Sequence, residues 1–193
     1  MHIADGIVTI EAAVAAYAVS LGAVAIAGKK AETEDIPRMG LTAAALFSVS
    51  LIHFPVAGTS VHLGLFGLAG IILGFKAFPA VFTALLFQCL IFQHGGLLSL
   101  GLNAFNMGAG AAAAVLVWKW SGLPEPLRAG AAGFLGVVIP AALMAFEFRL
   151  SGYGKGIIYI LGIYAVVGIV EAALTIAAVG FFRKIKSPIL EKT

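Results

Sequence analysis

The chain has 193 residues, of which 61% are hydrophobic and only 11% are charged. A water-soluble domain of this length cannot hide so much apolar surface, so a soluble globular protein is excluded. The net charge of +3 is small, and basic residues in so apolar a chain set membrane topology rather than bind nucleic acid. The composition predicts a single transmembrane domain over residues 1–193, placed in the cell membrane, with no nucleic-acid partner.

Seven apolar segments follow one another, each near the roughly 20 residues that a membrane-spanning helix needs. They lie at about residues 8–28, 39–54, 61–76, 78–93, 103–118, 129–148 and 156–182. The stretches between them are charged or rich in glycine and proline. This pattern predicts an all-α membrane protein with seven transmembrane helices.

Positive charges divide unevenly between alternate connections. One side holds only Arg149 and Lys155, and the other side holds ten residues: Lys29, Lys30, Arg38, Lys76, Lys119, Arg128, Arg183, Lys184, Lys186 and Lys192. Because basic residues gather on the cytoplasmic side, this bias predicts an N-terminus outside and a C-terminus in the cytoplasm. Every histidine of the chain then falls in or beside an external segment. These are His2, His53, His62 and His94.

The opening MHIADG lacks the basic start of a cleavable signal peptide, so we expect the mature chain to keep Met1. A free amine on Met1 and the amide nitrogen and Nδ1 of His2 can chelate one metal ion through a five-membered and a six-membered ring. The three nitrogens lie in one plane and leave a corner that a second imidazole could fill. Planar nitrogen coordination suits Ni(II) and Cu(II). The alternative is that His2 is a solvated terminal residue without a ligand.

Two further histidines, His53 and His62, lie in the stretch HFPVAGTSVHLG, residues 53–64. Its proline, glycine and hydroxyl residues predict a structured loop before a helix start, which Thr59 or Ser60 could cap. A histidine in the first turn of a spanning helix is costly unless paired, so His62 is a candidate ligand. A solvated imidazole at the membrane surface is the alternative. For His53 we expect an interfacial position or a supporting contact to a ligand.

The fourth histidine opens HGGLLSLGLNAFNMG, residues 94–108. The two glycines after His94 imply a tight turn or a close backbone approach. Asn103 and Asn106 are three residues apart and share a helix face, where amides either join helices or brace a ligand loop. In the last segment Glu171 interrupts GIVEAAL as a functional candidate or a structural group, and the sequence supplies no partner for it.

Other functions are open at this point. An intramembrane serine protease would use Ser60 with His62 or His94, but no GxSxG motif is present. A haem-binding subunit would use His53 and His94 as axial ligands. A metal permease working alone is a third alternative. The sequence has no GxxxxGK[ST] loop, so we expect neither ATP hydrolysis nor another catalytic residue in this chain.

Three stretches together resemble the CbiM/NikM family, the substrate-capture subunits of energy-coupling-factor importers for nickel and cobalt. They are MHIADG, PVAGTSVHL and LLFQCLIFQHGGLLSLGLNAFNMG, and the resemblance covers essentially the whole chain. It implies a seven-helix fold and a planar site for Ni(II) or Co(II) made by the amine of Met1, two nitrogens of His2 and His62. Around such a site we expect His53, Ser60, His94, Asn103 and Asn106 as supporting residues.

The resemblance also implies partners: a membrane coupling protein, two ATPase subunits and a small accessory membrane subunit. Nickel enzymes or cobalamin synthesis would use the imported metal. Many members carry a serine-rich loop with HPTG after the metal histidine, whereas this chain has VAGTSVHLGLFG. The choice between nickel and cobalt is therefore left open.

Overall fold

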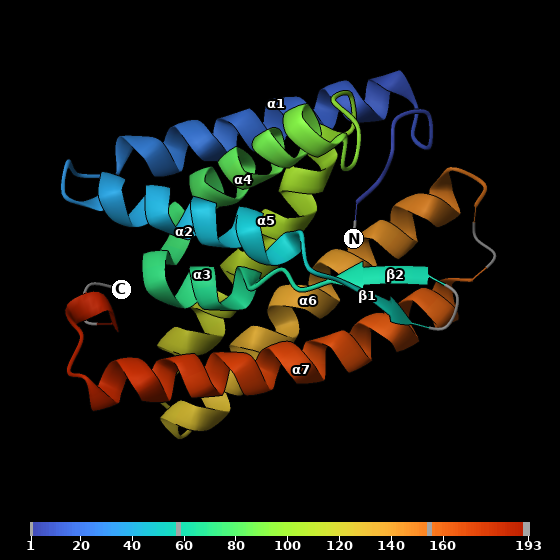
Figure 1. Ribbon diagram of the computed structural model, residues 1–193. Coiled ribbons are helices and arrows are strands. Elements are labelled where there is room, and N and C mark those ends of the chain that lie inside the picture. The colour runs from blue at the N-terminus through green and yellow to red at the C-terminus, as the bar shows by residue number, and fades with distance from the viewer. Residues whose placement is uncertain (1, 57–58, 154–155, 191–193) are drawn as a thin grey trace.

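The computed structural model describes residues 2–56, 59–153 and 156–190, with only the backbone described at 55–56 and 59–60. It is a helical bundle with a small β-hairpin at one end (Figure 1). The helices are α1 (Ile10–Lys29), α2 (Asp35–Ser50), α3 (Phe66–Leu73), α4 (Ala77–Phe92), α5 (Leu100–Lys119), α6 (Glu125–Leu150) and α7 (Ile157–Lys184). Two 3₁₀ turns, η1 (Gly74–Lys76) and η2 (Pro188–Leu190), complete the helical part.

Five helical stretches of the described chain are long and apolar enough to cross a membrane. They are α1, the run Phe66–Phe92 that contains α3, η1 and α4, and the helices α5, α6 and α7. The predicted segments 61–76 and 78–93 therefore contribute to one such stretch, and α2 has only 16 residues. A multi-pass, mostly helical membrane protein is confirmed, whereas the count of seven spans and the orientation of the termini stay predictions.

The all-α prediction is wrong at residues 53–62, where the chain forms an antiparallel hairpin of β1 (His53–Val56) and β2 (Thr59–His62). Its register places His53 opposite His62. The predicted segment 39–54 thus ends in a strand, and the segment 61–76 begins in one. Two strands of four residues each are too short for the alternation of apolar and polar residues to be visible in the sequence.

Local sequence explains several helix ends. Thr9 precedes α1 and its Oγ1 accepts a hydrogen bond from the amide of Ala12 at 3.4 Å. Glu11 in the first turn and Lys29 in the last turn suit the positive and negative ends of the helix dipole. At the far end of the chain, α7 follows Gly156, whose φ of 109° requires the freedom of glycine.

Glycines let α3, α5 and α6 pack with their backbones close together. A Cβ on Gly67 would lie 2.7 Å from the Cα of Gly133, and a Cβ on Gly110 would lie 2.6 Å from the carbonyl oxygen of Gly136. Gly133 and Gly136 on α6 are thus points of close helix contact. In a bilayer the van der Waals packing at such contacts helps to hold helices together, because the hydrophobic effect does not drive helix association in lipid.

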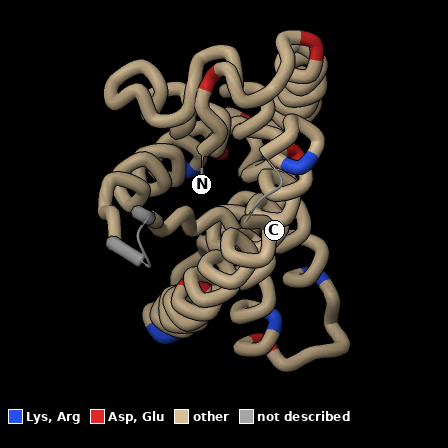
Figure 2. Tube along the Cα trace, turned by 90° about the vertical axis from the view of Figure 1, so that its right-hand side faces the viewer, with Lys and Arg blue, Asp and Glu red and all other residues tan. Residues whose placement is uncertain are grey.

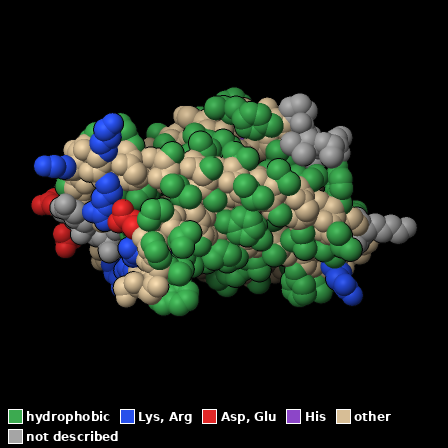
Figure 3. Space-filling view, turned by 90° about the horizontal axis from the view of Figure 1, so that it is seen from below, with side chains coloured by type: hydrophobic (Ala, Val, Ile, Leu, Met, Phe, Trp, Pro, Cys, Tyr) green, Lys and Arg blue, Asp and Glu red, His purple; other side chains and the backbone are tan. Residues whose placement is uncertain are grey.

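The outer surface of the bundle is apolar around its middle, and charged side chains gather mainly at one end (Figure 3). Ile158 on α7 is 87% exposed, which fits a face covered by lipid. At the end opposite the hairpin, Lys76 pairs with Asp35 at 2.5 Å and Arg183 pairs with Glu125 at 2.6 Å. The bundle therefore has a charged end and a histidine-bearing end.

Candidate metal centre

The N-terminal segment is held inside the histidine-bearing end of the bundle (Figure 2). The amide of Ile3 donates to Oδ1 of Asn103 at 2.8 Å, and Nδ2 of Asn103 donates to the carbonyl oxygen of Ile3 at 3.0 Å. The Ile3 side chain is only 1% exposed. This paired contact fixes the backbone one residue after His2, because a buried amide pair that lost its partner would be left unsatisfied.

The two glycines after His94 make room for this segment. A Cβ on Gly96 would overlap the carboxylate of Asp5 and lie 2.6 Å from the Asp5 amide nitrogen. A Cβ on Gly95, whose φ is +76°, would lie 2.9 Å from Nδ2 of Asn103 and 3.6 Å from Nδ1 of His2. The close backbone approach predicted for HGG is therefore confirmed, and the segment that approaches is the N-terminus.

Asp5 anchors the same segment to the residues that lead into α5. One carboxylate oxygen accepts from the amide of Ser99 at 2.8 Å and the other accepts from the amide of Leu98 at 3.2 Å. The hydroxyl of Ser99 donates to the carbonyl oxygen of Ala4 at 3.1 Å. Hydrogen bonds from Ile3, Ala4 and Asp5 to the residues at the start of α5 thus set the path of the chain after His2.

The structure brings all four histidine rings together at this end. The ring centroids of His2 and His62 are 5.1 Å apart, and those of His2 and His94 are 5.8 Å apart. His53 completes the group, 5.5 Å from His62 and 5.1 Å from His94. The cluster joins the N-terminal segment, both strands of the hairpin and the turn after α4, which are far apart in the sequence.

Hydrogen bonds define the tautomer of His62. Its Nδ1 lies 2.9 Å from the carbonyl oxygen of Leu63, and because a carbonyl oxygen only accepts, Nδ1 carries the proton and Nε2 keeps the lone pair. His62 is 6% exposed, and burial lowers the pKa of its imidazole to about 3. The ring is therefore neutral at physiological pH, as a metal ligand must be.

His2 is also kept neutral. Burial, reinforced by the neighbouring imidazoles, holds its pKa well below the usual value of 6.5. Its Nε2 is buried and has no hydrogen-bond partner among the described residues. A buried ring nitrogen without a partner is uncommon. In the chelate expected from the sequence it is Nδ1 of this ring, not Nε2, that would bind the metal ion.

The cluster is not a ready-made site of three side chains: within the described residues, no group of three or more His, Cys, Asp or Glu is placed to hold a metal ion. A planar site that takes two nitrogens from the backbone needs only two imidazoles. On neighbouring corners of such a site, with metal–nitrogen bonds of about 2.0 Å, ring centroids would lie roughly 4.5 Å apart. The 5.1 Å between His2 and His62 is therefore within a small shift and a ring rotation of that arrangement.

The remaining predicted residues fall into different places. Met1 and the side chain of Ser60 lie outside the described residues. Asn106 does not join Asn103 on the N-terminal segment, since its Nδ2 donates to Glu147 on α6 at 2.7 Å. His53 is exposed, and its Nδ1 lies 2.9 Å from the carbonyl oxygen of Leu51.

Two carboxylates support this end without having been predicted to do so. Asp5 has the partners described above, and MHIADG marks it only as an acidic residue near the start. Glu171 was predicted without a partner, and its carboxylate accepts from the amides of Gly64 and Leu65, two and three residues after His62. Both contacts link residues about a hundred positions apart, for which a single sequence carries no signal.

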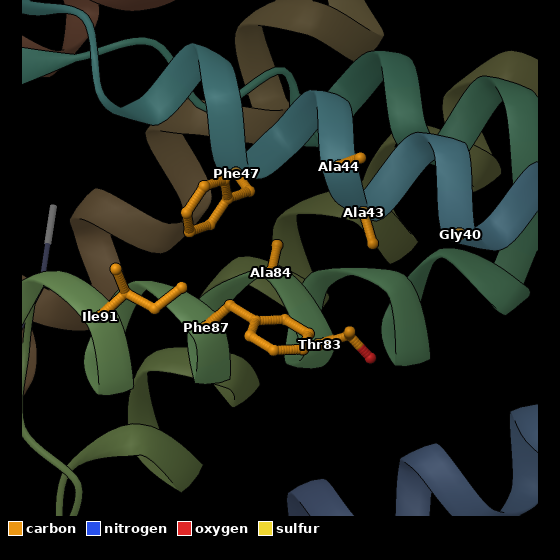
Figure 4. Close-up of a pocket in the computed structure, with 8 residues that line it drawn as sticks. All are labelled: Gly40, Ala43, Ala44, Phe47, Thr83, Ala84, Phe87 and Ile91. Atoms are coloured by element: carbon orange, nitrogen blue, oxygen red, sulfur yellow. The ribbon is translucent and has the colours of Figure 1, made fainter.

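A groove away from the histidines is a separate feature. It has a volume of about 420 Å³ and lies between α2 and α4 (Figure 4). Its lining consists of Gly40, Ala43, Ala44, Phe47, Thr83, Ala84, Phe87 and Ile91. None of these side chains ionises or binds metal, so the groove has no part in the chemistry of the histidine cluster.

Comparison with known proteins assigns the family. The family described as "Cobalt uptake substrate-specific transmembrane region" (CbiM) matches residues 2–189. A Haemophilus influenzae protein provisionally named a metal transport protein is 30% identical, with 100% of this chain and 98% of that protein covered. A provisionally named fused nickel transport protein NikMN of Archaeoglobus fulgidus is 29% identical over 100% of this chain and 68% of that protein.

A solved structure agrees. The crystal structure of a transition metal transporter superposes with a TM-score of 0.87 at 25% identity, covering 100% of this chain and 97% of that one. The overall fold is thus that of a known transition metal transporter. The chain belongs to the CbiM family of transmembrane components for cobalt and nickel uptake.

Proposed function

We propose that this chain is the substrate-specific component of an ATP-driven energy-coupling-factor importer and that it captures Ni(II) or Co(II) at its histidine-bearing end. The observation that carries the proposal is the docked N-terminus, which Asn103 holds so that the rings of His2 and His62 lie 5.1 Å apart. The family description names cobalt, and the name of the Archaeoglobus fulgidus relative contains nickel.

Four nitrogens form the proposed site. The amine of Met1 and the amide nitrogen and Nδ1 of His2 occupy three corners of a square, and Nε2 of His62 occupies the fourth. The amide must lose its proton, which requires a strongly polarising ion and excludes Mg(II) and Ca(II), whose preferred ligands are oxygens. His53 and His94 lie against this pair and line its approach, with His53 on the exposed side.

The proposed orientation puts the histidines outside and the charged end in the cytoplasm. Its support is the excess of basic residues at the charged end, several of which are paired there, as in Lys76–Asp35 and Arg183–Glu125. Energy would come from two ATPase subunits through a membrane coupling protein, with a small accessory membrane subunit. Metal uptake by vesicles that contain this chain alone would instead identify it as a permease that needs no partner.

The direct test is a titration of purified protein that begins at Met1. We expect one Ni(II) or Co(II) per chain, with the absorption spectrum of planar nitrogen coordination for nickel, and with Mg(II) unable to compete. Competition between nickel and cobalt in the same sample would then settle the preferred substrate. Absence of stoichiometric binding of either ion would remove the proposed function.

Replacing Gly96 by alanine should loosen the docked segment, because the new methyl group would overlap the carboxylate of Asp5. We expect Ni(II) affinity to fall by roughly 10-fold or more, the range seen when groups that orient metal ligands are changed. Gly22→Ala on α1 is the matched control, since nothing lies within 4 Å of the place its new methyl group would take and alanine is the better helix former. Equal affinity in the two variants would show that the path of the N-terminus does not govern binding.

A further inference from the structure

Glu171 lies in the middle of the apolar helix α7 and is fully buried. Its carboxylate accepts hydrogen bonds from the amide of Gly64, and from the amide of Leu65 at 2.9 and 3.0 Å to its two oxygens. A carboxylate within a membrane helix is expensive and is kept only where something depends on it. The group that depends on Glu171 is the short connection between β2 and α3.

This connection begins directly after His62, the last residue of β2. The carbonyl oxygen of Leu63 accepts from Nδ1 of His62, and the next two amides, those of Gly64 and Leu65, point to Glu171. Three consecutive residues thus join the imidazole to α7. Leu65 has a left-handed backbone with φ of 50°, which a non-glycine residue adopts only when its surroundings impose it.

The neighbouring turn of α7 faces the same imidazole across a hollow. His62 and Leu63 line this hollow of about 240 Å³ together with Val166, Val167 and Val170. The carboxylate one residue beyond Val170 holds the backbone that follows the ring. Packing alone would leave the ring free to turn about its bonds, and the hydrogen bonds remove that freedom.

We propose that Glu171 is a positioning residue for the metal ligand His62. By fixing the Gly64 and Leu65 amides it fixes the Leu63 carbonyl, and that carbonyl selects the tautomer and direction in which Nε2 of His62 faces the ion. Glu171 does not touch the ion, because its oxygens already accept from the two amides. The inference rests on the proposed function. It gives a residue of α7 a role in the strength and selectivity of metal capture.

The test is a double-mutant cycle of Glu171→Gln and His62→Ala, read by Cu(II) affinity and by Cu(II) electron paramagnetic resonance. Cu(II) is the probe because it binds nitrogen ligands more tightly than Ni(II), so that the three nitrogens left in His62→Ala still give a measurable affinity. In the otherwise unchanged protein we expect Glu171→Gln to lower affinity by about 10-fold or more. The amide retains the shape but turns an NH₂ group toward a backbone amide, so one hydrogen bond is lost.

In the His62→Ala background Glu171→Gln should change affinity by less than about twofold, since interacting residues give non-additive effects. When His62 is present, the Cu(II) resonance spectrum of Glu171→Gln should shift toward the spectrum of His62→Ala. The control is Thr175→Val, one turn further along α7, where the fully buried hydroxyl has no hydrogen-bond partner among the described residues. It should leave affinity and spectrum unchanged. If Glu171→Gln does not yield folded protein, Glu171→Asp, whose shorter arm cannot reach both amides, takes its place in the cycle.

The outcomes separate the two hypotheses. An equal loss in both backgrounds, or no loss in either, overturns the positioning role of Glu171 while His62 remains a ligand. If the unchanged protein binds no Ni(II) or Co(II), or if His62→Ala binds as tightly as the unchanged protein, the proposed function itself fails.

Discussion

Acetylating the amine of Met1 should abolish tight Ni(II) binding by this protein without changing its fold. The acetyl group removes the lone pair of one proposed ligand and opens the five-membered chelate ring. A structural four-ligand site is worth about 10–16 kcal/mol, so loss of one corner costs roughly 3 kcal/mol, or about a hundredfold in affinity. Near neutral pH the reagent prefers an α-amine, with a pKa of about 8, to lysine amines, with a pKa of about 10.4.

The control for acetylation is the same treatment with Ni(II) already bound, which should protect the amine and preserve the site. Unchanged affinity after complete modification would exclude the amine as a ligand.

A one-residue glycine extension before Met1 gives a different and diagnostic result. It places the histidine third, where the new amine, two amides and Nδ1 supply four nitrogens by themselves. We expect the extended protein to bind nickel independently of His62.

His62→Ala should weaken Ni(II) binding by about a hundredfold, because it removes one of four ligands from a buried site. His53→Ala is a matched control, since His53 sits opposite His62 in the hairpin and loses the same ring. His53 is exposed, whereas His62 is only 6% exposed. We therefore expect the loss of His53 to lower Ni(II) affinity by less than about 10-fold. Titration calorimetry of both variants, with thermal unfolding as the check on the fold, measures the difference.

Equal losses in the two variants would make His53 a ligand. The ring positions allow this outcome to be examined directly, because His53 lies 5.5 Å from His62 and 5.1 Å from His94. A loss in His53→Ala alone would move the site to the exposed side of the cluster and away from His2.

The long helices were predictable because an apolar stretch near 20 residues long has few ways to satisfy its backbone in a bilayer other than as a helix. α5, α6 and α7 all lie where such stretches were predicted. The prediction failed where elements are short. The η1 turn carries helical structure across Lys76 and joins α3 to α4. The two strands between residues 53 and 62 have four residues each, too few for alternation to stand out in the sequence.

The candidate site was predictable in part. His2 and His62 could be chosen from the chelating start of the chain and from the resemblance, and the HGG turn indicated that something approaches closely. The contacts that hold the site were not accessible, because Ile3–Asn103 and Gly64–Glu171 span 100 and 107 residues. Asn106 illustrates the limit: a three-residue step rotates the side chain enough to reach Glu147 on α6 instead of the N-terminal segment.

The carboxylate of Asp5 has a further consequence, since the amides of Leu98 and Ser99 that it accepts from lie just before Leu100, where α5 begins. It therefore ties the residues just before α5 to the N-terminal segment. If this carboxylate were lost, the amides of Leu98 and Ser99 would lose their acceptor. The entry to a central helix and the path of the N-terminal segment thus depend on one acidic side chain.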